Sequence, residues 1–282
     1  MKFGASTFIW VSPFSGKTYD LFDKVKDFGF DLLEICIEDP STINTYEIKE
    51  LSKKKAVDVL VCGAFGPERD VSSEDAGIRE SGLNYINKCI DFAAELGSPL
   101  VSGPMFSATG KTHLLSKSER QQQWQWAVEN LTKSAEYAGE KGVKLAIEPL
   151  NRFETDFINT TEQGLELVEK INHHNVGLLL DTFHMNIEEK DIANALRLAG
   201  DRLFNFHACS NDRGIPGVDN IPWESVSKAL KDINYDGPVV IESFTTEIKE
   251  ISRAVSQWRT LAPSQDSIAQ EGLPFLKKVL MS

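Results

Sequence analysis

The chain has 282 residues, with 42 acidic residues against 30 basic ones and a formal net charge of -12. Such an acidic chain is a poor partner for nucleic acid or anionic lipid, which attract basic surfaces. No apolar run is long enough to cross a bilayer, and the first ten residues lack the apolar region and cleavage site of a secretory signal. No two of the four cysteines are spaced as CxxC. Together these features predict a protein of the reducing cytoplasm.

Strand-like and helix-like segments alternate from end to end. The apolar runs predict eight strands, at Phe3–Trp10, Asp31–Glu38, Asp58–Phe65, Pro99–Phe106, Val143–Glu148, Val176–Asp181, Leu203–His207 and Pro238–Glu242. Apolar residues at helical spacing predict helices at Tyr19–Phe28, Tyr46–Lys55, Asp75–Leu96, Lys117–Glu140, Thr161–Ile171, Asp191–Ala199, Trp223–Ile233, Ile248–Arg259 and Ser267–Val279.

Eight strands that are each followed by a helix favour parallel pairing with right-handed crossovers. We therefore predict one domain over residues 1–282, an α/β fold of the (β/α)8 or TIM barrel type, for which about 250 residues are typical. An open doubly wound sheet is the alternative. That fold usually has fewer strands and a glycine-rich first turn, and this chain has no GxGxxG motif.

Four successive strands end in a side chain that can bind a metal. These residues are Glu148, Asp181, His207 and Glu242. A carboxylate or imidazole at the end of a buried strand is unfavourable unless it is paired or bound to a metal. The carboxyl ends of the strands are also where TIM barrels carry their active sites. Three carboxylates and one imidazole suit Mn²⁺ or Mg²⁺ better than a metal that prefers thiolates. We therefore predict a divalent metal at the mouth of the barrel.

Other polar residues follow these strand ends closely. Glu154 comes six residues after Glu148, and His184 comes three residues after Asp181. If the chain turns after Asp181, both side chains can point into one cavity. Arg213 follows His207 and is suited to bind a hydroxyl, carbonyl or phosphate oxygen, although a loop arginine can also simply pair with an acidic neighbour.

The segments around these residues resemble those of the ketose 3-epimerases, which include the D-tagatose, D-allulose (psicose) and L-ribulose 3-epimerases of the xylose-isomerase-like superfamily. The shared segments are IEPLNRFE, LDTFHMNIEE, FHACSNDRGIPG, IPWESVSKALKDINYDGPVVIESF and SRAVSQWR. The resemblance extends over nearly the whole chain and is densest from Glu148 onward. The first half departs more, which leaves the preferred ketose open.

The resemblance implies a role for each site residue. The metal ligands are Glu148, Asp181, His207 and Glu242, and the two glutamates also act as acid and base. Substrate-binding residues are Glu154, His184, Arg213 and, by a weaker match, Cys62. The implied reaction inverts C3 of a free ketohexose or ketopentose through a cis-enediolate. We expect Mn²⁺ as the metal, with Co²⁺ or Mg²⁺ as alternatives, and a homodimer or homotetramer that binds neither nucleic acid nor membrane.

Three other functions use a similar barrel. An aldose–ketose isomerase, or an inosose isomerase or dehydratase, would use the same metal site. A nuclease of the related endonuclease type carries a histidine-rich site with several zinc ions and a basic face, whereas this chain has 5 histidines and is acidic. A non-catalytic sugar-binding barrel could lose either glutamate, and both are present. The last loop, SFTTE, lacks the glycines of a barrel phosphate site, which favours a free sugar.

Overall fold

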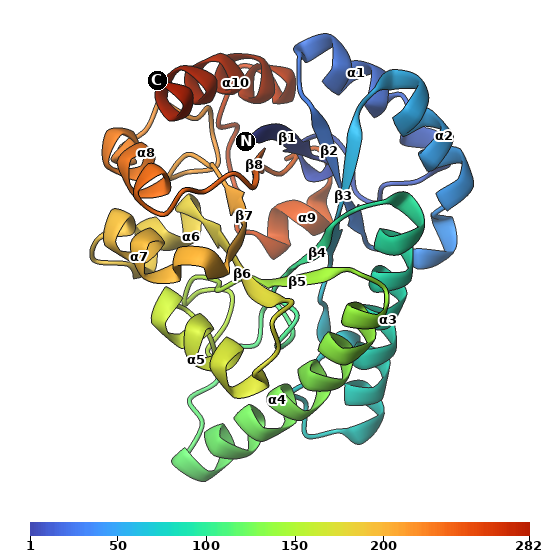
Figure 1. The fold of residues 1–282 in the computed structure, drawn as a ribbon, viewed down its shortest axis with the longest axis vertical. Coiled ribbons are helices and arrows are strands. Elements are labelled where there is room, and N and C mark those ends of the chain that lie inside the picture. Colours follow the sequence, from blue (N-terminus) through green and yellow to red (C-terminus); the bar gives the residue numbers. More distant parts are fainter.

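Eight parallel strands pair in chain order and close on themselves in the computed structural model of the protein. The structure describes the backbone of residues 1–282 and every side chain except that of Glu250. The strands are β1 (Lys2–Ser6), β2 (Leu32–Ile37), β3 (Asp58–Gly63), β4 (Leu100–Gly103), β5 (Lys144–Ile147), β6 (Val176–Asp181), β7 (Leu203–His207) and β8 (Pro238–Ile241). The predicted (β/α)8 barrel is confirmed, and Figure 1 shows its ring of helices around the strands.

Ten helices connect and cover the strands in the described chain. They are α1 (Leu21–Phe28), α2 (Thr45–Lys55), α3 (Ala76–Leu96), α4 (Lys117–Glu140), α5 (Thr161–Ile171), α6 (Thr182–Glu188), α7 (Ile192–Ala199), α8 (Trp223–Asp232), α9 (Lys249–Ala254) and α10 (Gln265–Met281). Local sequence sets several helix ends. A capping box of Ser116 and Glu119 begins α4, and Gly97 ends α3 in the left-handed conformation. None of the described helices combines the length and apolar character needed to span a membrane.

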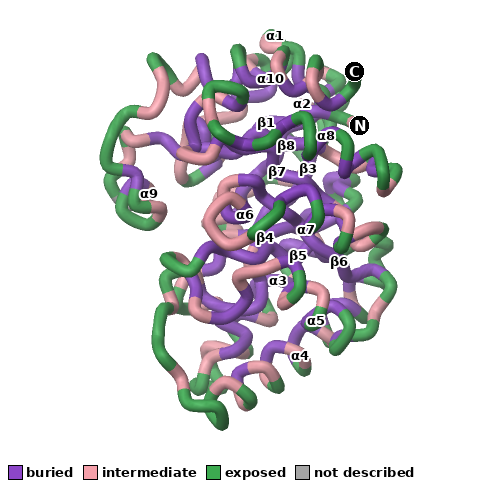
Figure 2. The backbone as a smooth tube through the Cα atoms, turned by 90° about the vertical axis from the view of Figure 1, so that its left-hand side faces the viewer, coloured by how far each residue is buried: buried purple, intermediate pink, exposed green. Residues whose placement is uncertain are grey.

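The predicted elements differ from the structure mainly near the barrel mouth. The first strand ends at Ser6 because Thr7–Ile9 form a short 3-10 helix, whose first turn is capped by the Ser6 hydroxyl. The helix expected at Ile248–Arg259 is confined to Lys249–Ala254. Helix α6 was not predicted, and it begins directly after Asp181. In Figure 2, α9 lies on the side of the molecule opposite the two chain termini.

Side chains alternate between two environments along each strand, as the two-residue period of a strand requires. Outward-facing residues pack against the helices in the largest apolar cluster. Inward-facing residues form a separate apolar layer inside the barrel, made of Leu32, Leu60, Leu100, Ala146, Leu179 and Val240. Figure 2 shows buried residues along the strands at the centre and exposed residues on the outer parts of the helices.

On several of these strands the next inward-facing position is a carboxylate. Glu148, Asp181 and Glu242 each lie two residues beyond a member of the apolar layer, namely Ala146, Leu179 and Val240. On β7, His207 is the register partner of Asp181. The strand period therefore places the four predicted ligands on one level at the carboxyl end of the barrel.

Candidate active site

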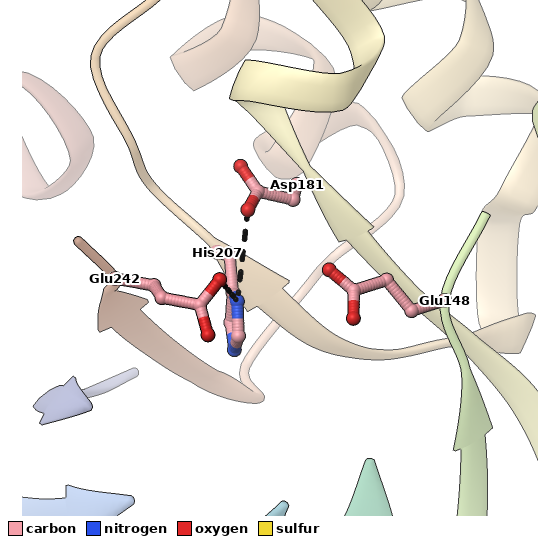
Figure 3. Close-up of side chains that lie close together, drawn as sticks. All are labelled: Glu148, Asp181, His207 and Glu242. Carbon is pink, nitrogen blue, oxygen red and sulfur yellow. Dashed lines mark ion pairs between the residues drawn. The ribbon is translucent and has the colours of Figure 1, made fainter. Parts of the chain in front are cut away.

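The four strand-end residues meet in the structure. Each of Glu148, Asp181, His207 and Glu242 offers one ligand atom that lies within 4.8 Å of the other three, and all four residues are buried. Figure 3 shows the Glu148 and Glu242 carboxylates on opposite sides, with Asp181 and His207 between them. This arrangement is what a single metal ion with oxygen and nitrogen ligands requires.

An unpartnered ring nitrogen supports the fit of a cation. His207 Nδ1 lies 3.8 Å from Asp181 Oδ2 and 3.5 Å from Glu242 Oε2. The atom is buried and has no hydrogen-bond partner among the described residues. A buried polar atom normally has a partner, and one that faces carboxylates is suited to share a cation with them. The group therefore fits one divalent metal.

Asp181 is oriented by the helix that follows it. Its Oδ1 accepts a hydrogen bond of 2.8 Å from the backbone N–H of Phe183, at the start of α6. Because the cap uses Oδ1, Oδ2 is left to face the site. A strand-end aspartate that also caps a helix cannot rotate freely, so its second oxygen is held toward the other ligands.

Arg213 bridges two of the carboxylates. Its Nη1 lies 2.5 Å from Asp181 Oδ2 and 3.1 Å from Glu242 Oε2. The residue adopts a φ of +69°, a left-handed conformation that is uncommon outside glycine. The Ser243 hydroxyl donates to the Arg213 carbonyl at 2.7 Å and helps to hold this conformation. A strained backbone kept in place by its neighbours is common at functional sites.

The electrostatics of the site reflect its excess of buried carboxylates. Burial and the nearby charge of Glu242 raise the pKa of Glu148 well above its ordinary value. Burial alone would also raise the pKa of Asp181, but the Arg213 guanidinium lowers it. Burial opposes a charged His207, yet the carboxylates of Glu34 and Glu242 raise its pKa. The site therefore attracts positive charge, as protons or as a metal ion.

His184 and Glu154 are brought together by a residue that the sequence analysis did not single out. The Asn151 backbone N–H donates to His184 Nδ1 at 3.1 Å, and its side-chain Nδ2 donates to Glu154 Oε1 at 2.7 Å. His184 Nε2 lies 3.7 Å from Glu148 Oε1. Burial and the positive charge of Arg213 lower the pKa of His184 to about 3, so the ring is neutral. Asn151 lies in the NRFE segment, but nothing in its residue type marks it.

Cys62 lies beside the four-residue group and is not part of it. It is buried in a small apolar cluster with Phe8, Cys36 and Phe244. The neighbouring Cys36 thiol and burial raise the pKa of Cys62 well above its ordinary value, so it remains a thiol. This cluster forms an apolar wall near the site. The predicted contact between Cys62 and a sugar stays a prediction.

Glu34 was also missed by the sequence analysis. It lies on β2, is 0% exposed, and approaches His207 from inside the barrel. A signal was present, because Glu34 is a charged residue inside the otherwise apolar run LLEICI. A buried charge within a strand needs a partner, and that partner comes from the opposite side of the barrel.

Comparison with known proteins places this chain in a family. The sequence profile of the xylose isomerase-like TIM barrel matches residues 22–279. The chain belongs to this family. It is 37% identical to a probable ketose 3-epimerase of Synechocystis sp. over 99% of this chain and 96% of that protein. It is 32% identical to the D-psicose 3-epimerase of Agrobacterium fabrum over 99% of both chains.

Solved structures agree with this placement. A D-allulose 3-epimerase from Methylomonas sp. in complex with D-allulose superposes with a TM-score of 0.92, at 31% identity, over 99% of this chain and 97% of that one. A D-psicose 3-epimerase from Clostridium cellulolyticum with D-tagatose gives a TM-score of 0.92 at 30% identity, over 99% of both chains. These matches confirm the resemblance to the ketose 3-epimerases. The relatives are carbohydrate epimerases, which confirms the expected isomerase class.

Proposed function

We propose that this protein is a metal-dependent ketose 3-epimerase that acts on a free ketohexose or ketopentose. The observation that carries the proposal is the pair of buried glutamates, Glu148 and Glu242, on opposite sides of one metal-binding group. The relatives named ketose 3-epimerases support the substrate class, because two of their structures hold D-allulose and D-tagatose.

The proposed reaction needs a base on one face of the sugar and an acid on the other. The C3 hydrogen of a ketose is acidic because the C2 carbonyl stabilises the enediolate that its removal produces. One glutamate takes this proton and the other returns one to the opposite face, which inverts C3. General acid–base catalysis of this kind contributes about 10²–10⁴-fold in rate.

A bound divalent ion, for which we propose Mn²⁺ with Co²⁺ or Mg²⁺ as alternatives, would stabilise the negative charge that develops on the carbonyl oxygen. Asp181 and His207 would hold the ion together with the two glutamates. Since both glutamates would also be ligands, a bound ion would hold them on either side of the place proposed for the reacting carbon.

Three residues around this group are placed to orient the sugar. The Arg213 guanidinium presents fixed donors, and the neutral His184 ring faces the same space as Glu148. Glu154 is half-buried and can accept a hydrogen bond from a sugar hydroxyl. We propose that these groups bind the end of the ketose nearest the carbonyl, and that the apolar wall around Cys62 faces the rest of the sugar.

Turnover of a ketohexose in D₂O, followed by NMR, tests this function. We expect deuterium at C3 of the epimerised product, with C4 and C5 unchanged, because a carboxylate reached by water exchanges its proton. Deuterium at C1 or C2 together with an aldose product would show an aldose–ketose isomerase instead. A C3 epimer without deuterium would contradict the two-glutamate scheme.

A further inference from the structure

We propose that Glu34 is a positioning residue for the metal site. Its carboxylate accepts the Nε2 hydrogen of His207, so that the unprotonated Nδ1 is presented to the ion. The inference rests on the metal site of the proposed function. It adds a residue from the opposite side of the barrel, 173 positions earlier in the chain.

The two ring nitrogens of His207 face different surroundings. Nε2 lies 3.1 Å from Glu34 Oε1 and 3.2 Å from Glu34 Oε2, deep in the barrel. Nδ1 faces the carboxylate of Glu242, one of the proposed ligands, and has no hydrogen-bond partner among the described residues. An ionised carboxylate only accepts hydrogen bonds, so the nitrogen beside Glu34 must carry the hydrogen. A neutral ring then has its lone pair on Nδ1.

Glu34 is itself held by donors from two other strands. Asn205 Nδ2 on β7 donates to Glu34 Oε2 at 3.1 Å, and the Ser102 hydroxyl on β4 donates to the same oxygen at 3.3 Å. Glu34 and Asn205 are each 0% exposed. Because both donors and the ring nitrogen approach the carboxylate, a group that only accepts is required at this position.

The register of the strands explains why this contact lies beneath the metal site. Glu34 is the register partner of Leu60, and Asn205 is the register partner of Leu179, and both partners are members of the apolar layer. The contact therefore lies between the apolar layer and the proposed ligands. In metal sites a carboxylate in this place fixes the ring orientation and the tautomer of the ligating histidine, and its loss typically weakens metal binding about 10–100-fold.

The test compares Glu34→Gln with the wild-type protein and with a matched control. The amide is the same size as the carboxylate, but its NH₂ group must replace one of the two oxygens. At Oε2 it would face the donors Asn205 and Ser102, and at Oε1 it would face His207 Nε2 at 3.1 Å, so in either orientation a donor meets a donor. The control is Glu38→Gln, the same change just beyond the end of β2, where Glu38 is half-buried and accepts from Ser12 at 2.5 Å. We expect the dissociation constant of Mn²⁺, measured by calorimetry on metal-stripped protein, to rise about 10–100-fold in Glu34→Gln and to stay unchanged in the control.

Nitrogen NMR of protein carrying isotope-labelled histidine gives a readout that a merely structural role would not change. The chain has only 5 histidines, so the His207 signals can be assigned by substitution. With Cd²⁺ as a diamagnetic probe, we expect coupling of the metal to Nδ1 and a hydrogen on Nε2 in the wild type. Coupling to Nε2 would overturn the proposal, and this result does not depend on the folding of Glu34→Gln.

The failure of the inference can be told apart from failure of the proposed metal site. If the wild type binds Mn²⁺ and Glu34→Gln binds it equally well with the same His207 tautomer, the positioning role is wrong while the metal site stands. If the wild type binds neither Mn²⁺ nor Cd²⁺, the metal site itself is wrong and the role of Glu34 is excluded with it.

Discussion

Glu148→Gln separates the chemical role of this glutamate from its effect on stability. The substitution keeps the shape of a side chain that is 5% exposed and removes one of three crowded carboxylates. Its turnover should fall about 10²–10⁴-fold, because an amide can neither take nor return the C3 proton. That loss corresponds to about 3–5 kcal/mol of transition-state stabilisation.

The free energy of unfolding of the metal-free variant should not fall with its turnover. The ligand atoms of Glu148 and Glu242 lie within 4.8 Å, and two unit charges at that distance repel by about 3.5 kcal/mol at an effective dielectric constant of 20. Protonation of Glu148, which its raised pKa favours, relieves part of this repulsion in the wild type. We therefore expect the free energy of unfolding of metal-free Glu148→Gln to equal the wild-type value or to exceed it by up to about 3 kcal/mol.

The assay follows epimerisation with Mn²⁺ present and thermal unfolding with and without the metal. Glu148→Asp keeps a carboxylate on a shorter side chain and should retain part of the activity. Glu166→Gln, on a side chain that is 55% exposed, is the control for a change of charge away from the site. Near-wild-type turnover of Glu148→Gln would refute its role as acid or base. A clearly lower melting temperature of the metal-free variant would refute the argument from repulsion.

Three further predictions test the rest of the site. Dialysis against a strong chelator should abolish turnover, and activity that survives chelation would exclude a metal enzyme. Mn²⁺ at 100 times its dissociation constant should add about 2.7 kcal/mol to the free energy of unfolding. Arg213→Ala should lower the free energy of unfolding of the metal-free protein, measured in urea, by about 3–5 kcal/mol, because it leaves the buried charges of Asp181 and Glu242 unpaired. An unchanged urea midpoint would show that this bridge is not stabilising. Asn151→Ala should lower kcat/KM at least about tenfold, chiefly through a higher KM, because the side chain no longer holds Glu154 and His184, and one lost hydrogen bond contributes about 1.4 kcal/mol. A loss confined to kcat would place Asn151 in the chemical step.

Most of the fold could be predicted from the sequence because its signals are local. The strands β6 and β7 have the predicted bounds, and Asp181 and His207 are their last residues. Glu148 and Glu242 come directly after β5 and β8. A run of apolar residues that ends in a charged one reports both burial and the strand end. The same local pattern failed at Thr7–Ile9, where an apolar run forms a 3-10 helix.

The metal identity, the oligomeric state and the cellular compartment stay predictions. Mn²⁺, Co²⁺ and Mg²⁺ all suit three carboxylates and one imidazole, so the ligand set alone does not choose among them. We propose that the preference among ketoses depends on the apolar wall that includes Phe8 and Phe244.

The sequence by itself determined the order of the elements and the four residues at the strand ends, since neighbours along the chain encode the two-residue period and the end of each strand. Only the tertiary structure decided which groups support them. Glu34 contacts His207 across 173 positions, and Asn151 contacts His184 across 33. The physical reason is that the closure of the barrel, and not any local pattern, brings the inner face of β2 against that of β7 and so determines which nitrogen of His207 faces the site.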